Sequence, residues 1–289
     1  MRYACGMAHR NHAYLSVLSW PEGFTDDRKI EALVMAAALD PHQAKLSIRR
    51  STPSVIASIE AEDAPEILRV LHKMGVLALA PTLAQFAGYP EPESPNSVEV
   101  FPEKDLGAFA VRTRDGGAWT FQAPELRMVV FGKARAITTH VRNEPSSGGS
   151  YIAVAGFGAA VVAASEGHSG LRYERNMSVQ PVLDLHIHQH TPKGVVPRLV
   201  RLTGGRTRIG LIGDGDPRPS LLKQSDPIAD LRALAPDARY ELGFDRFSPP
   251  ADARYRSCFG GGTGSHRLSG ESFHFFSVWS ALLDRMLRG

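Results

Sequence analysis

The chain has 289 residues, of which 43% are hydrophobic and 22% are charged. This balance is typical of a globular protein with ordinary cores and excludes a chain that is disordered over most of its length. The 33 basic and 30 acidic residues give a formal net charge of +3, too small for a surface built throughout to bind nucleic acid. The excess lies at the end of the chain, where residues 246–289 hold six arginines and three acidic residues.

The two cysteines, Cys5 and Cys258, lie near opposite ends of the chain, which excludes a disulfide framework. Their scarcity favours a cytoplasmic, reducing location. The longest apolar stretch, residues 151–164, is shorter than the roughly twenty residues that a membrane-spanning helix needs, so we expect no membrane span. The first apolar run is too short for a secretory signal.

The first part of the chain predicts a small domain that begins with a strand and two helices. Residues 13–20 form a short apolar run ended by turn residues, as in a strand. Apolar residues at helical spacing then predict a helix over about 27–39. Asp40 and Pro41 supply the N-cap and the first residue of a second helix.

A second strand, a third helix and a last strand complete this domain. Residues 55–59 alternate between apolar and smaller or polar residues, as in a half-buried strand. Asp63 and Pro65 open a helix that Gly75 ends, and residues 76–80 form the closing strand. The sequence therefore predicts a βααβαβ interaction domain over residues 13–85.

Several short motifs follow one another along this domain. A Lys-Ile pair lies in the first helix, an Ala-Lys pair opens the second, a proline breaks the chain, and a leucine-rich third helix ends in glycine. These positions are Lys29-Ile30, Ala44-Lys45, Pro53, Leu68-Leu71 and Gly75. In this pattern, which covers about a quarter of the chain, the segment resembles the C-terminal domain of the bacterial ribosomal stalk protein. The glycine-containing turn of that family is replaced here by Leu39-Asp40-Pro41.

The resemblance implies a bacterial-type protein whose exposed basic helix recruits protein partners and which has no catalytic residue. It therefore implies a partner-binding role for Lys45, Arg49 and Arg50. A solvated helix face without a partner explains the same three charges, and the sequence alone favours that plainer interpretation.

The middle of the chain predicts a second domain, rich in antiparallel strands. Residues 86–97 form a proline-spaced, acidic stretch, which predicts a stiff linker. Over residues 98–245, apolar runs alternate with turn residues, as in a series of hairpins. In this antiparallel series, residues 191–194 would join the runs 182–190 and 195–202, and Gly204-Gly205 would join the second of these to the run 207–212. A helix that carries Ile228, Leu231 and Leu234 would cover one opening of this sheet. The order is that of a pleckstrin-homology-like barrel, a fold analogy that carries no function by itself. The fold class expected for the whole chain is α+β.

The C-terminal part predicts a linker followed by a helix. Residues 246–271 are rich in glycine, proline and arginine, whereas residues 272–289 have the spacing of an amphipathic helix. A helix of this length is marginal alone and must pack on something. Packing on a sheet of its own chain is the favoured interpretation. In the alternative, it binds a protein partner or a second copy of the chain, with Phe276 and Trp279 as anchors.

A polar stripe on one predicted strand is the sharpest candidate for chemistry. Side chains alternate along a strand, so Asp184, His186, His188 and His190 would share one face. Two histidines at this spacing can bind one Zn²⁺ or another divalent metal, and a third ligand from a neighbouring strand would make a catalytic-type site. The polar face of an amphipathic strand is the favoured interpretation, because no second ligand cluster has a recognisable spacing.

The sequence contains no complete catalytic set. Residues 167–171 lack the last glycine of a nucleophile elbow, and residues 260–264 lack the lysine of a phosphate loop. We therefore expect a non-enzymatic adaptor or assembly component that binds proteins and needs no cofactor. Two alternatives stay open. One is a metal-binding protein or metal-dependent enzyme built on His186 and His188. The other is an RNA- or ribosome-associated protein that uses the basic helix and the arginine-rich tail.

Overall fold

The structure is a computed structural model, which describes residues 11–101, 108–113, 116–143, 152–153, 171–203, 208–211, 227–248 and 270–288. The chain divides into two compact units. Unit 1 takes its described residues from 11–89, 246–248 and 274–288, and unit 2 takes the others. Helices and antiparallel sheets occur together, which confirms the expected α+β class. Both cysteines and the 260–264 glycine run lie outside the described residues.

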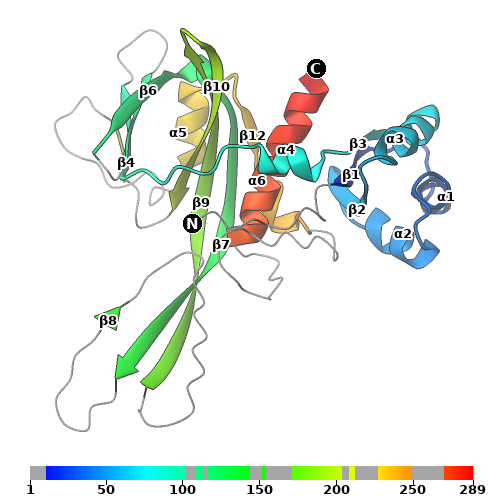
Figure 1. The fold of residues 1–289 in the computed structure, drawn as a ribbon, viewed down its shortest axis with the longest axis horizontal. Helices are drawn as coiled ribbons and strands as arrows, with labels where there is room; N and C mark the ends of the chain where they lie inside the picture. The colour runs from blue at the N-terminus through cyan, green and yellow to red at the C-terminus, as the bar shows by residue number, and fades with distance from the viewer. Residues whose placement is uncertain are drawn as a thin grey trace. The chain divides into compact units, whose positions relative to one another are not determined.

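Unit 1 has the element order that the sequence predicts, extended by a short helix and by most of the C-terminal helix (Figure 1). The elements are β1 (His12–Ser19), α1 (Asp26–Ala37), α2 (Pro41–Ile48), β2 (Ser54–Glu60), α3 (Ala64–Lys73), β3 (Leu77–Leu79), α4 (Leu83–Ala87) and α6 (Gly270–Arg288). Helix α6 begins two residues before the predicted start, and its first turn belongs to unit 2.

The start of α2 is fixed by the residues that predict it. The carboxylate of Asp40 accepts hydrogen bonds from the backbone N–H groups of His42 and Gln43, at 2.8 and 3.3 Å. Pro41 occupies the first turn, where its missing N–H costs nothing. Two of the donors that a helix leaves unpaired are thus satisfied locally.

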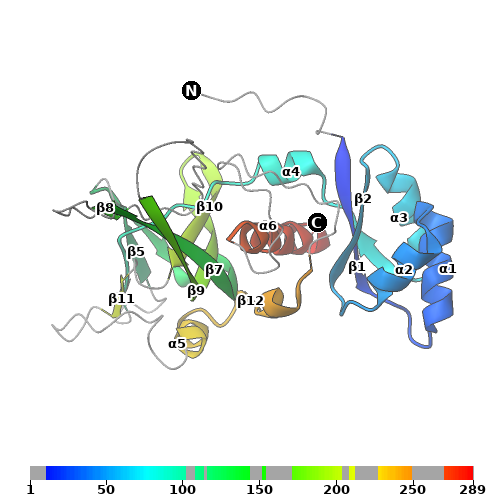
Figure 2. The same cartoon turned by 90° about the horizontal axis from the view of Figure 1, so that it is seen from below.

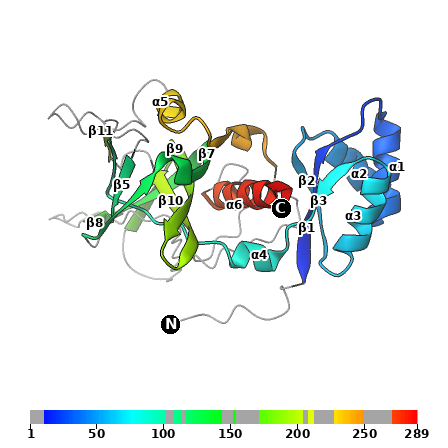
Figure 3. The same ribbon diagram turned by 90° about the horizontal axis from the view of Figure 1, so that it is seen from above.

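The sheet of unit 1 is covered on both faces. Its order is β2-β1-β3, with both pairs antiparallel. Leu15 and Val17 of β1 belong to a buried core with residues of α1, α2 and α3, whereas Tyr14 and Ser16 point to the opposite face and are buried as well. Figures 2 and 3 show α1, α2 and α3 on one side of this sheet and α4 and α6 on the other.

Helix α6 supplies the cover of the second face. The rings of Phe275 and Tyr14 meet edge to face with centroids 4.9 Å apart, and Phe86 of α4 stacks on Phe275 at 5.0 Å. The indole N–H of Trp279 donates a hydrogen bond of 2.9 Å to the hydroxyl of Ser16. The C-terminal helix therefore packs on the first strand of its own chain.

Unit 2 is built from two sheets and one main helix. Its elements are β4 (Ser97–Phe101), β5 (Ala108–Arg112), β6 (Ala118–Gln122), the 3-10 turn η2 (Ala123–Glu125), β7 (Leu126–Asn143), β8 (Ile152–Ala153), β9 (Leu171–Thr191), β10 (Gly194–Thr203), β11 (Arg208–Leu211), α5 (Pro227–Leu234), β12 (Arg239–Glu241) and the 3-10 turn η4 (Gly243–Arg246). One sheet has the order β10-β9-β7-β12 with β8 beside β7, and the other has the order β11-β4-β5-β6.

The core of unit 2 lies between these sheets and α5. Phe109 and Phe121 stack with ring centroids 4.7 Å apart, beside Leu185 of β9. Ile228 and Leu231 of α5 are buried in the same cluster, so the predicted covering helix is present. None of the helices in the described ranges has the length and apolarity that crossing a bilayer requires.

Two features of unit 2 differ from the sequence prediction. Strands β7 and β9 are 18 and 21 residues long, and Figure 1 shows them continuing as a pair past the end of β10. Strand β11 was expected to follow β10 as the next antiparallel strand, but it pairs in parallel with β4. The outer edge of β10 is not open to it, because Glu93 bridges Val200 there.

Gly132 provides a test of the packing in unit 2. A Cβ atom at this position would lie 2.6 Å from Cδ1 and 2.9 Å from Cβ of Phe244. We expect Gly132→Ala to lower the free energy of unfolding by about 1–3 kcal/mol, the usual cost of overpacking, in urea denaturation. Adding Phe244→Ala should cost less in this variant than in the parent, because loss of Cγ and Cδ1 removes two of the three close contacts. Equal stability of Gly132→Ala and the parent would contradict the close contact.

Candidate functional site

The outward face of α2 carries a basic and apolar stripe. His42, Lys45, Leu46 and Arg49, here called the α2 stripe, follow the spacing that places residues on one side of a helix, and all four are exposed. Leu46 keeps 48% of its surface exposed. Ala44 and Ser47 occupy the opposite, buried face. The orientation of α2 thus leaves a large apolar side chain in water between two cations.

The three predicted partner-binding cations of unit 1 are not equivalent. Lys45 and Arg49 are exposed, and neither forms an ion pair with another described residue. Arg50 is half-buried, and its guanidinium donates hydrogen bonds to the carbonyls of Val55 and Ser248, at 2.8 and 3.4 Å. Two cations are therefore available to a partner, whereas Arg50 serves the fold of unit 1.

The two predicted anchors of the C-terminal helix lie inside unit 1. Phe276 is 3% exposed and Trp279 is 1% exposed. Phe247 packs against both rings, with centroid distances of 5.0 and 5.3 Å. Both side chains therefore pack in the interior of unit 1 and present no surface to a partner.

The polar stripe of β9 is buried at one end. Asp184 is fully buried and His186 is 2% exposed, whereas His188 is half-buried and His190 is exposed. The guanidinium of Arg201 on β10 donates two hydrogen bonds to the Asp184 carboxylate, at 2.8 and 2.7 Å. Arg201 also lies over the ring of Phe273. The expected polar face of an amphipathic strand is therefore wrong for Asp184 and His186.

The same geometry bears on the metal hypothesis. Each oxygen of the Asp184 carboxylate already accepts a hydrogen bond from Arg201. In the part of the chain that the structure describes, no group of three or more His, Cys, Asp or Glu side chains is placed to hold a metal ion. Metal binding by His186 and His188 stays a prediction, which metal analysis of untagged protein and of His186→Ala would test.

Sequence reasoning missed the partner of Asp184, although a signal was present. A hairpin between β9 and β10 was predicted at residues 191–194. With Thr191 opposite Gly194, the antiparallel register places Arg201 directly opposite Asp184. Opposite charges at directly facing positions of two strands attract each other. Extending the predicted register by seven residues would have found the pair.

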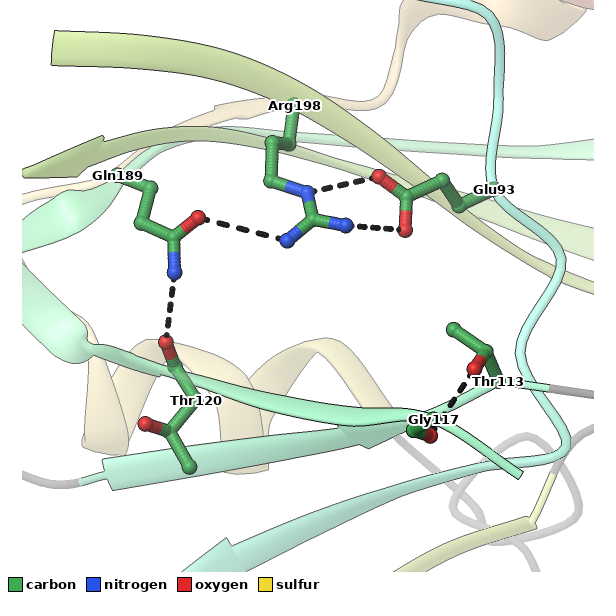
Figure 4. A network of polar contacts seen from close by, with 6 residues as sticks. All are labelled: Glu93, Thr113, Gly117, Thr120, Gln189 and Arg198. Atoms are coloured by element: carbon green, nitrogen blue, oxygen red, sulfur yellow. Dashed lines mark hydrogen bonds and ion pairs between the residues drawn. The ribbon is translucent and has the colours of Figure 1, made fainter. Parts of the chain in front are cut away.

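A second polar network lies on the surface of unit 2 (Figure 4). The guanidinium of Arg198 on β10 binds both carboxylate oxygens of Glu93, each at 2.8 Å. Gln189 accepts a hydrogen bond of 3.4 Å from the same guanidinium and donates one of 3.1 Å to the carbonyl of Thr120. The ring of Trp119 lies 3.6 Å from the guanidinium carbon of Arg198. Sequence reasoning singled out none of these residues.

Comparisons of the chain with protein-family models, with curated proteins and with solved structures found no match. The resemblance to the stalk-protein domain and the pleckstrin-homology-like analogy thus stay predictions. The candidate surfaces rest on the geometry of the chain itself.

The hydroxyl of Ser16 tests whether Trp279 belongs to the interior of unit 1. Ser16→Ala leaves the buried indole N–H without its acceptor, which should lower the free energy of unfolding by about 1–3 kcal/mol. Ser19→Ala is the matched control, since Ser19 lies in the same strand and is exposed. We expect the control to change stability by less than about 0.5 kcal/mol in the same denaturant titration. Equal changes in the free energy of unfolding for the two substitutions would contradict the hydrogen bond between Trp279 and Ser16.

Proposed function

We propose that the chain is a non-enzymatic adaptor or assembly component that binds a protein partner through the α2 stripe. The partner has an acidic surface with an apolar pocket that takes the side chain of Leu46. The observation that carries this proposal is that Leu46 is exposed between Lys45 and Arg49. Neither of these two cations forms an ion pair with another described residue.

The chemistry of the stripe supports a protein as its partner. A large apolar side chain exposed in water gains free energy when a partner buries it, at about 25 cal/mol per Å² of apolar surface. The two flanking cations steer an acidic partner and fix its register more than they add affinity. A nucleic acid would use the cations but would not need Leu46.

Affinity capture with charge-reversed protein tests the proposal. The parent chain and the variant Lys45→Glu with Arg49→Glu are each used to capture proteins from the cells that make the chain. We expect the variant to capture at least tenfold less of the proteins that the parent captures. Leu46→Ala should deplete the same proteins several-fold, since truncating a central apolar anchor typically costs about 1–2 kcal/mol of binding free energy. Quantitative mass spectrometry after chemical cross-linking measures both effects.

Two matched controls belong to this experiment. Arg28→Glu with Lys73→Glu makes the same change of charge at exposed positions of α1 and α3, and Met35→Ala truncates another apolar side chain, which is 66% exposed. Neither control should change the captured proteins. Depletion by the controls as well as by the stripe variants would contradict a specific site. Capture that disappears after ribonuclease treatment and falls steeply with salt would instead favour RNA association.

A truncation of the C-terminal helix is unsuitable for the same purpose. Removing α6 would expose the face of β1 that carries Tyr14 and Ser16. Partners lost on truncation would then report the loss of the fold, whereas the surface substitutions leave the core of unit 1 intact.

A further inference from the structure

The outer edge of β10 in unit 2 carries an extended segment of the chain. The backbone N–H of Glu93 donates to the carbonyl of Leu199, and the backbone N–H of Arg201 donates to the carbonyl of Glu93, both at 2.8 Å. Glu93 and Val200 thus form an isolated parallel bridge, in which Val200 belongs to β10 and Glu93 belongs to no strand. The arrangement is that of a peptide added to a sheet edge, a common mode of peptide recognition.

The edge of β10 offers backbone groups at alternate residues. The backbone groups of Leu199 and Arg201 point away from β9, toward the open side of β10. The backbone groups of Pro197, two residues earlier, therefore point to the same side. A proline lacks the N–H that a longer added strand would need, and edge prolines are a usual defence against pairing. The edge can therefore take a short extended segment at Leu199–Arg201 and resists a long one.

The side chain of Arg198, next to this edge, binds a side chain of the added segment. Arg198 holds the carboxylate of Glu93 in a bidentate pair, and both side chains remain partly exposed, at 25% and 30%. Figure 4 shows Gln189 on the other side of the guanidinium, bound in turn to Thr120. Stacking on Trp119 and the bond to Gln189 hold the guanidinium in one orientation, which prepares it for a planar carboxylate.

Glu93 is the residue through which the bound segment joins the edge of β10. In an extended segment Pro95 would be the next residue after Glu93 to turn its backbone toward β10, and it has no N–H group to donate. The two backbone bonds and the partly exposed ion pair that Glu93 forms with β10 are contacts that a competing peptide can replace one for one.

We propose that the edge at Leu199–Arg201, together with Arg198, is a binding site for an extended acidic segment of a partner protein, and that residues 90–95 fill it within the chain. The partner presents one carboxylate, from Glu or Asp, to Arg198 and two backbone bonds to β10. This surface is separate from the α2 stripe, and the proposal does not depend on the function proposed for that stripe.

The peptide Tyr-Pro-Glu-Pro-Glu-Ser-Pro-Asn-Ser, the sequence of residues 89–97, is a suitable probe. In the parent chain the tethered segment competes at an effective concentration on the order of millimolar, so the labelled peptide should bind weakly. In full-length Glu93→Ala, which leaves Arg198 without its carboxylate, we expect binding at least tenfold tighter by fluorescence anisotropy. Glu91→Ala is the matched control, because Glu91 is exposed in the same segment, and it should bind as the parent does.

The peptide itself provides the second comparison. A peptide with Gln in place of the glutamate at position 93 should bind the Glu93→Ala protein at least tenfold more weakly, whereas a peptide with Gln at position 91 should bind as the unchanged peptide does. When the protein carries Arg198→Ala as well as Glu93→Ala, the two Gln peptides should bind equally. If circular dichroism shows that Glu93→Ala does not fold, Glu93→Gln, which keeps the shape, replaces it. Equal binding by Glu93→Ala and the parent, or equal loss with either Gln peptide, would overturn the proposal. Dimerisation of Glu93→Ala in gel filtration would assign the edge to a second copy of the chain and overturn it as well.

Discussion

The packing of unit 2 depends on one buried ion pair. β9 lies between β10 and β7, and its residues 182–187 are buried on both faces, so Asp184 has no access to water. A buried carboxylate costs several kcal/mol, as an order of magnitude, unless a partner and hydrogen bonds compensate it. Arg201 provides both from the directly opposite position of β10. Removal of either partner alone would leave the other without compensation on the face that carries Asp184 and His186.

The same constraint shapes unit 1. Its central strand β1 is also covered on both faces, and its buried hydroxyl Ser16 meets the indole N–H of Trp279. In both units a polar group on a central strand is satisfied by a specific partner, and the helix or strand that carries the partner is positioned accordingly. Asp184 and His186, which the sequence suggests as candidates for chemistry, are thus part of the buried interior of unit 2. The α2 stripe and the edge of β10 are surface features, and both proposals concern them.

Local features of the fold could be predicted from the sequence, and distant pairings could not. The cap Asp40-Pro41, the helices of unit 1 and the hairpin between β9 and β10 follow from patterns within about ten residues. No local pattern states that α6 packs on β1, a contact that joins residues 263 positions apart. The mostly apolar run of residues 13–18 was a hint at a second cover, because a strand without a clear polar face is typically enclosed on both sides. The parallel pairing of β11 with β4 had no signal at all.

For the candidate sites, residue type was a poorer guide than register and exposure. The histidines of β9 suggested a metal, yet the decisive fact about Asp184 is the arginine opposite it. Lys45 and Arg49 were found from the sequence, and Arg50 beside them was grouped with them although the fold uses it differently. Glu93 and Arg198 are 105 residues apart, so neither could be singled out without the structure.

A double-mutant cycle on Asp184 and Arg201 tests most directly whether the polar stripe of β9 serves the fold. We expect Asp184→Asn and Arg201→Met each to lower the free energy of unfolding by about 3–5 kcal/mol, because each leaves the other group buried without its partner. The double variant should lose much less than the sum, giving a coupling energy of at least about 2 kcal/mol. A coupling energy below about 0.5 kcal/mol, or a gain in stability on Asp184→Asn, would show that Asp184 is kept for a purpose other than folding.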